Sequence, residues 1–173
     1  MELNSYQEKA VTYALYPVEH AVTYPSIGVV DEGLELLEKC TINYEDKLER
    51  KKEITKEAGD VFWYMATLCQ DLEIPLQEMT RNLILPRKED YTDIRLQFMI
   101  DLQHFVGKTK KRLRGDDGIT DEITLTHLQE VYGSFMVLLT EEEIDVKEAL
   151  QNNIDKLEDR KERGVLKGDG DNR

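Results

Sequence analysis

Residues 53–72, EITKEAGDVFWYMATLCQDL, place a charged segment directly before a long apolar block. From Val61 to Leu72 the block is apolar nearly all round, which on a helix means burial on most faces. Glu57 and Asp60 stand at its leading edge, three residues apart, so they project from one helical face. Carboxylates against a core are costly unless a cation or a hydrogen-bond donor holds them. The stretch therefore predicts a buried helix with chemistry at its charged edge.

Helical periodicity continues through the rest of the chain, and only four prolines interrupt it. We expect helices at 3–15, 27–44, 74–85, 92–113, 122–140 and 146–163. A further helix, the third in the chain, precedes residue 74 and continues through residue 72. The charged segment 45–53 is either a solvated turn or the start of the third helix. Pro25 falls in the loop before the second helix, Pro75 opens the short helix and Pro86 closes it. Without strand-like alternation of useful length, the sequence predicts an all-α bundle with mostly short connections.

A shift of 70 residues reveals a weak internal repeat. It aligns the apolar pattern of the two halves and several identical residues: Asp31 with Asp101, Val61 with Val131, Leu68 with Leu138, Glu73-Ile74 with Glu143-Ile144, Glu78 with Glu148, and Asn82 with Asn152. Amphipathic helices of similar length also align in this way by chance. In the second copy Leu102 and Phe105 replace Glu32 and Glu35, so a genuine repeat would make the second half a pseudo-subunit without these acidic residues.

The composition excludes several classes of partner. The 173 residues fit one domain with a real core. With 36 acidic and 23 basic residues, the net charge of -13 repels nucleic acid and anionic membranes. Cys40 and Cys69 have no CxxC spacing, and we find neither a signal peptide nor a stretch of about 20 apolar residues. We expect a soluble cytoplasmic protein with reduced thiols that binds neither nucleic acid nor membranes.

Two acidic pairs stand out from the scattered charges, because apolar sequence surrounds each of them: Glu32 with Glu35, and Glu57 with Asp60. If the second and third helices pack antiparallel, the pairs meet across the interface. Four converging carboxylates repel one another unless cations neutralise them. Oxygen ligands without histidine or cysteine suit Mg²⁺, with Mn²⁺ as a substitute. Mg²⁺ held in this way takes phosphate oxygens, so the pattern indicates a phosphorylated substrate.

The basic residues near the end of the chain are the candidate phosphate ligands. Lys156, Arg160, Arg163 and Lys167 follow steps of three and four residues, with Asn153 one turn earlier. Cations also stabilise a helix C-terminus through its dipole, which is the alternative explanation. In the functional interpretation, Asn153, Lys156 and Arg160 contact a triphosphate while Arg163 and Lys167 assist.

The aromatic residues allow two interpretations. We expect Trp63 in the core, and Tyr64 lies one turn after Asp60 on the same face. Tyr13, Tyr16 and His20 either form a base pocket or serve in packing and loop structure.

The segment DEGLE (31–35), followed by 21 residues and EAGD (57–60), resembles the MazG-type all-α nucleoside triphosphate pyrophosphohydrolases, whose pattern is EExxE, a spacer and ExxD. Asp31 replaces the usual first glutamate and is the position least expected to bind metal. The resemblance extends to YQEKAVTYALYP, YPSIGVVDEGLEL and the C-terminal NIDKLEDRKERGVLKGDGDNR, which is similar to bacterial and phage members. It divides the chain into a catalytic half (1–86), an insertion or degenerate repeat (87–144) and a C-terminal helix and basic tail that complete the domain (145–173).

The resemblance implies hydrolysis of (deoxy)nucleoside triphosphates to monophosphate and pyrophosphate. Glu32, Glu35, Glu57 and Asp60 would bind Mg²⁺, Glu35 would take the proton of the attacking water, and Tyr64 would approach the nucleotide. It also implies a homo-oligomer, a dimer or tetramer, unless a genuine repeat makes one chain a pseudo-dimer. Phosphoribosyl-ATP or a nucleotide alarmone are alternative substrates. An alternative of another class is a non-catalytic helical interaction protein with an acidic, cation-binding groove.

Overall fold

The computed structural model describes residues 1–81, 83–89 and 92–167, and within them it confirms an all-α fold. These residues form the helices α1 (Leu3–Ala10), α2 (Thr23–Thr41), α3 (Lys47–Asp71), α4 (Glu78–Arg81), α5 (Ile94–Leu113), α6 (Asp121–Glu141) and α7 (Val146–Glu162), and the 3-10 helices η1 (Val11–Tyr13) and η2 (Val18–His20). None of the described helices is both long and apolar enough to cross a membrane.

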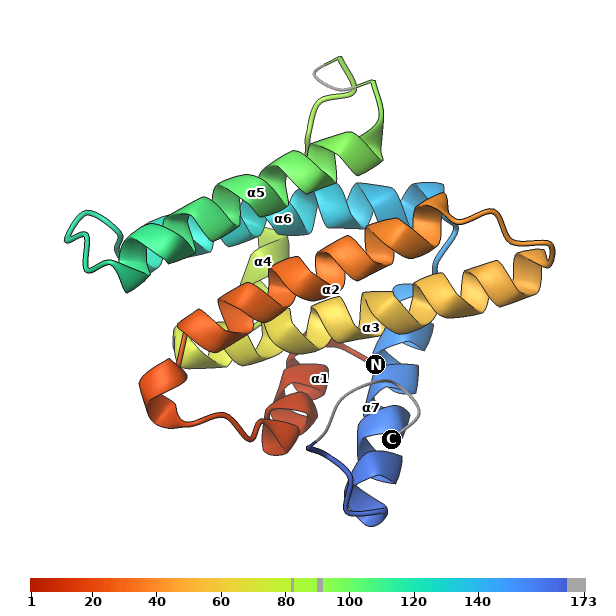
Figure 1. Ribbon diagram of the computed structural model, residues 1–173, viewed down its shortest axis with the longest axis horizontal. Coiled ribbons are helices and arrows are strands. Elements are labelled where there is room, and N and C mark those ends of the chain that lie inside the picture. The colour runs from red at the N-terminus through yellow and green to blue at the C-terminus, as the bar shows by residue number, and fades with distance from the viewer. Residues whose placement is uncertain (82, 90–91, 168–173) are drawn as a thin grey trace.

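The fold consists of two helical hairpins, with α1 and α7 next to α3 on the side away from α5 and α6 (Figure 1). Hairpin α2–α3 packs against hairpin α5–α6 mainly through α2 and α5, while α1 and α7 pack on α3. Three phenylalanines join the hairpins: the ring of Phe135 lies 5.0 Å from that of Phe62 and 5.8 Å from that of Phe98. At Gly33, an added Cβ would lie 2.8 Å from Leu102 Cδ1, so the missing side chain lets α2 approach α5 closely.

Side-chain caps explain where several helices begin. Asp46 caps α3 by accepting a hydrogen bond from the Leu48 amide at 2.8 Å. Segment 47–53 is therefore the first part of the helix rather than a separate turn, and only 42–46 connect α2 to α3. Asp93, Thr120 and Asp145 cap α5, α6 and α7 in the same manner.

Several predicted helix boundaries differ from the structure, most clearly in the two helices next to Pro25 and Pro75. Helix α2 begins at Thr23, so Pro25 lies in its first turn and not in the preceding loop, and the helix ends at Thr41. Proline is tolerated there because the first-turn amides have no partner within the helix. The expected helix at 74–85 shrinks to α4, Glu78–Arg81, and 83–87 have no regular structure.

The second helix of each hairpin, α3 or α6, ends in the same backbone arrangement, as expected from the predicted repeat. Helix α3 is followed by Glu73 with φ 57°, and helix α6 by Glu143 with φ 55°. The next amide in each case, Ile74 or Ile144, donates to a carbonyl five residues back at 2.9 Å. This is the Schellman arrangement of a helix C-terminus, repeated at the offset of 70 residues. A common origin of the two halves, and the three-part division of the chain, stay predictions, and Asn82 lies outside the described residues.

Candidate functional site

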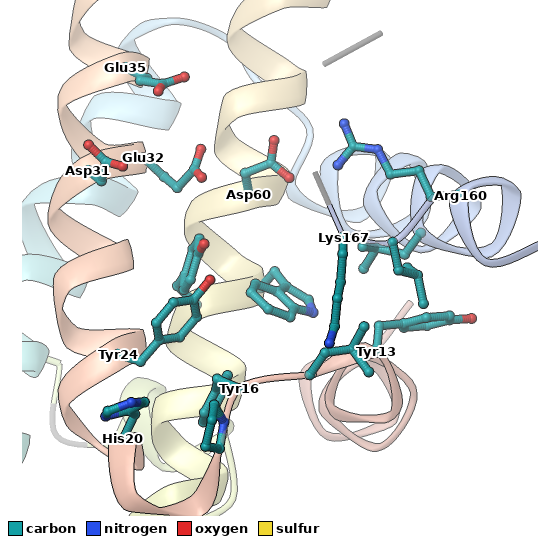
Figure 2. A pocket seen from close by; sticks show the side chains of 16 residues that line it. Tyr13, Tyr16, His20, Tyr24, Asp31, Glu32, Glu35, Asp60, Arg160 and Lys167 are labelled. Carbon is teal, nitrogen blue, oxygen red and sulfur yellow. The ribbon is translucent and has the colours of Figure 1, made fainter. Parts of the chain in front are cut away.

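A cleft of about 600 Å³ lies between α2, α3, the end of α7 and the segment that contains η1 and η2 (Figure 2). Carboxylates of α2 and α3 lie on one side of it, and Arg160 and Lys167 lie on another. It is lined by Tyr13, Leu15, Tyr16, Pro17, His20, Tyr24, Asp31, Glu32, Glu35, Asp60, Trp63, Tyr64, Leu157, Arg160, Leu166 and Lys167. The structure thus gathers acidic, basic and aromatic residues of four separate segments around one space.

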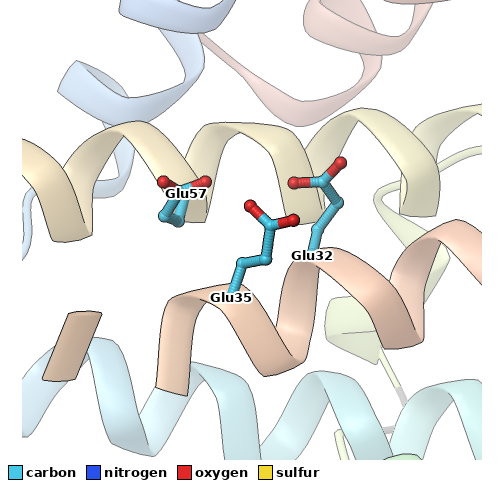
Figure 3. Close-up of side chains that lie close together, drawn as sticks. All are labelled: Glu32, Glu35 and Glu57. Atoms are coloured by element: carbon cyan, nitrogen blue, oxygen red, sulfur yellow. The ribbon is translucent and has the colours of Figure 1, made fainter. Parts of the chain in front are cut away.

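Three of the four predicted metal ligands form a compact group, the acidic triad of Glu32, Glu35 and Glu57 (Figure 3). One carboxylate oxygen from each lies within 4.8 Å of the others. Glu57 is only 1% exposed, and Lys56 Nζ lies 3.5 Å from its Oε1. Since all donors are carboxylate oxygens, the set fits a hard divalent cation such as Mg²⁺ or Mn²⁺.

The electrostatics of the acidic triad are most visible at Glu32. Burial raises the pKa of Glu32 from its ordinary 4.5 to about 8, and the negative charges of Asp60, Glu35 and Glu57 add to this effect, while Lys156 opposes it. A carboxylate with this pKa holds a proton at neutral pH and releases it when a cation arrives.

Asp60, the fourth predicted ligand, has different partners. Lys156 Nζ lies 2.5 Å from both of its carboxylate oxygens, and Asn153 Nδ2 donates to Oδ1 at 2.9 Å. The Tyr6 hydroxyl, fully buried, in turn donates to Asn153 Oδ1 at 2.7 Å. Asn153 and Lys156, predicted to contact a phosphate, therefore hold a carboxylate here. The sequence did not indicate Tyr6, because this contact joins positions 147 residues apart.

The other basic residues divide between the cleft and the surface. Arg160, 7% exposed, and Lys167 line the cleft. Arg163 is not among the lining residues and pairs with Asp159 at 2.6 Å on the surface of α7. Phosphate binding by any of them stays a prediction.

Aromatic side chains form the other end of the cleft. The rings of Tyr16 and Tyr24 lie 4.9 Å apart, and those of Tyr24 and Tyr64 lie 6.0 Å apart. The Tyr64 ring lies directly against the backbone of α2, where a Cβ on Gly28 would be 2.1 Å from Cδ1. Trp63, expected in the core, is half-buried at the cleft, and its Nε1 donates to the Ala10 carbonyl at 3.0 Å.

The position of this aromatic end depends on Asp71, which sequence reasoning also missed. Asp71 Oδ2 accepts hydrogen bonds from the Tyr16 hydroxyl at 2.9 Å and from the Val22 amide at 2.8 Å. Val22 has φ 64°, an unfavourable conformation for a β-branched residue. Asp71 thus fixes both ends of segment 16–22 to α3.

The equivalent region of the second hairpin has another character. Leu102 and Phe105, at the positions of Glu32 and Glu35, are buried in the core. Trp63 lines the cleft, whereas Gly133, 70 residues later, is covered by the backbone of Ile84. An added Cβ at Gly133 would be 1.8 Å from the Ile84 carbonyl oxygen. Among the described residues, no second group of three metal-ligating side chains lies as close together as the acidic triad.

Comparison with known proteins yields a phage relative. No protein-family model and no solved structure matches the chain. The Gene 37 protein of Mycobacterium phage L5 is 39% identical over 95 residues, which span 48% of this chain and 83% of the relative. The chain belongs to the family of that Gene 37 protein.

Proposed function

We propose that this protein is a MazG-like, Mg²⁺-dependent pyrophosphohydrolase that converts (deoxy)nucleoside triphosphates to monophosphates and pyrophosphate. The observation that supports the proposal most directly is the acidic triad, whose carboxylate oxygens lie within 4.8 Å of one another beside a cleft of about 600 Å³. A cleft of that volume is large enough for a nucleotide.

Glu32, Glu35 and Glu57 are the residues that would hold Mg²⁺. Bound there, the ion would supply Lewis-acid chemistry for an attacking water and neutralise charge on the phosphates. Their carboxylates come from two helices that pack against each other, which supports a site that is assembled before an ion binds.

The remaining chemistry belongs to the walls of the cleft. Arg160 and Lys167 supply positive charge for the phosphates, which an acidic chain otherwise repels. Tyr24 and Tyr64 line the cleft, and aromatic rings in this place suit a nucleotide base. Glu35, exposed at the rim of the acidic triad, is the residue that we expect to accept a proton from the attacking water.

A nucleotide panel tests the proposal. The protein is incubated with each nucleoside triphosphate and Mg²⁺, and pyrophosphate is detected as phosphate after addition of a pyrophosphatase. We expect turnover with at least one nucleotide and a loss of at least about 100-fold in Glu35→Gln, since even outer-shell partners of a metal contribute about 10- to 100-fold. Glu38→Gln, one turn further along α2 and outside the acidic triad, is the matched control and should retain full activity.

The same panel separates this proposal from the non-catalytic alternative. If no nucleotide is turned over, and calorimetry detects no nucleotide binding, the protein is not a nucleoside triphosphate pyrophosphohydrolase. Retained turnover in Glu35→Gln would likewise contradict the role given to the acidic triad.

A further inference from the structure

The ion pair of Lys156 and Asp60 lies beside the acidic triad but outside it. Lys156 Nζ lies 2.5 Å from both Asp60 oxygens, and the two side chains are only 20% and 17% exposed. Asn153 Nδ2 donates to Oδ1 as well, so both oxygens of Asp60 have donors supplied by the protein. A cation arriving at Asp60 therefore meets a carboxylate already neutralised by an ammonium group.

Helix packing holds this pair in place. At Gly59 an added Cβ would lie 2.9 Å from the Ala149 carbonyl oxygen and 2.9 Å from Asn153 Cβ, so α3 and α7 are in contact next to Asp60. The hydrogen bond from Tyr6 also fixes Asn153. Lys156 lies one turn after Asn153 on α7. The packing of α1, α3 and α7 against one another therefore holds its ammonium group next to Asp60.

We propose that the Lys156 ammonium group takes the place of a second divalent cation at Asp60, so that the site holds one divalent ion, at Glu32, Glu35 and Glu57. The inference rests on the proposed function, because it assumes that the acidic triad binds metal. It gives Asp60 a different role from the one that its motif position suggests. Asp60 anchors Lys156, and the positive charge that balances the fourth carboxylate is part of the protein.

The charge balance of the site supports this assignment. Asp31, Glu32, Glu35 and Asp60 line the cleft, and Glu57 lies beside them in the acidic triad; a divalent ion at the acidic triad leaves the charge of Asp60 uncompensated unless another cation is near. Lys156 supplies that charge at hydrogen-bonding distance. A second divalent ion would have to displace the ammonium group and would then repel it, which lowers its affinity.

Counting bound ions tests the proposal. Mn²⁺ is titrated into the nucleotide-free protein, and the number of ions per chain is measured by electron paramagnetic resonance and by calorimetry. We expect one ion per chain in the wild type. In Lys156→Gln a second ion should bind, at least about tenfold more tightly than any second ion binds to the wild type. In the double variant Lys156→Gln, Asp60→Asn the count should return to one.

Two matched variants control for charge and folding. Lys156→Arg keeps the positive charge and should bind one ion. Lys161→Gln removes a positive charge from the same helix, where Lys161 lies over the Tyr13 ring, and should also bind one ion. Thermal melting followed by circular dichroism shows whether each variant is folded.

The contradicting outcomes are distinct. Two tightly bound ions in the wild type would overturn the inference without any variant, and so would an unchanged count of one in folded Lys156→Gln. Neither result affects the proposed function, which needs only a metal at the acidic triad. If the wild type binds no ion at all, the metal site of the proposed function fails, and this inference fails with it.

Discussion

The raised pKa of Glu32 gives the sharpest prediction about the acidic triad. The perturbation is a change of pH, applied to the wild type and to Glu32→Gln, first without metal and then with Mn²⁺. Burial and three neighbouring carboxylates favour the neutral form of Glu32 in the folded protein, and neither acts in the unfolded chain.

The sign and size for the metal-free protein follow from linkage. The folded-state pKa of Glu32, about 8, exceeds the ordinary 4.5. Between pH 4.5 and pH 8, Glu32 therefore carries a proton in the folded protein but not in the unfolded chain. The Glu32 contribution to stability is therefore complete below pH 4.5 and is lost as the pH rises through 8. One pKa unit is worth about 1.4 kcal/mol, so the loss is at most about 5 kcal/mol and about 2 kcal/mol with solvent screening.

Metal binding should show the opposite trend with pH. With a pKa of about 8, roughly a tenth of Glu32 is ionised at pH 7 and roughly nine tenths at pH 9. The affinity for Mn²⁺ should therefore rise about tenfold over that interval, and binding at pH 7 should release about 0.9 proton per ion.

Two assays measure these quantities. Urea unfolding in the presence of a chelator, at several values between pH 5 and pH 8.5, gives the free energy of unfolding, and the difference between wild type and Glu32→Gln isolates the one carboxyl group. Calorimetry in buffers with different ionisation enthalpies counts the released protons. If the two proteins lose stability in parallel as the pH rises, or if Mn²⁺ binds at pH 7 without releasing a proton, the assignment of a raised pKa to Glu32 is wrong.

Two further predictions concern the packing around the site. Gly133→Ala should lower the free energy of unfolding by about 1–3 kcal/mol, because the new Cβ would meet the Ile84 backbone. Gly107→Ala, in open space on α5, should raise the free energy of unfolding by up to about 1 kcal/mol. Equal effects of the two substitutions in urea unfolding would contradict the close contact at Gly133. Tyr6→Phe should cost about 1 kcal/mol in stability and lower kcat more than it changes KM, because Asn153 loses the hydrogen bond that orients its amide; a steady-state analysis with unchanged kcat would show that the hydroxyl group has no role in positioning.

Local patterns were sufficient to predict most of the fold. The apolar periodicity located six of the long helical segments, and the spacing of Glu32, Glu35 and Glu57 on two adjacent helices was sufficient to bring them together. Such predictions succeed because residues three and four apart on a helix share a face, and because helices with a short connection pack as antiparallel neighbours.

The sequence could not show which residue each polar side chain would pair with or hydrogen-bond to. Lys156 was assigned to phosphate, yet in the structure it pairs with Asp60, 96 residues away. Asp71, for which the sequence indicated no role, fixes segment 16–22 through two hydrogen bonds. Contacts of this kind depend on how helices far apart in the chain pack, and no local periodicity records that packing.

The two hairpins show how one backbone form can serve two purposes. In the first, Glu32 and Glu35 face Glu57 across the helix interface, so burial there opposes ionisation. In the second, Leu102 and Phe105 at the equivalent positions belong to the core. The second hairpin also presents Phe98 and Phe135 to Phe62 of the first. Apolar contacts of this kind stabilise a fold in proportion to the area that they bury, while a group of carboxylates weakens it. The second hairpin thus supplies packing energy that lets the first retain an electrostatically unfavourable group, as the proposed cation site requires.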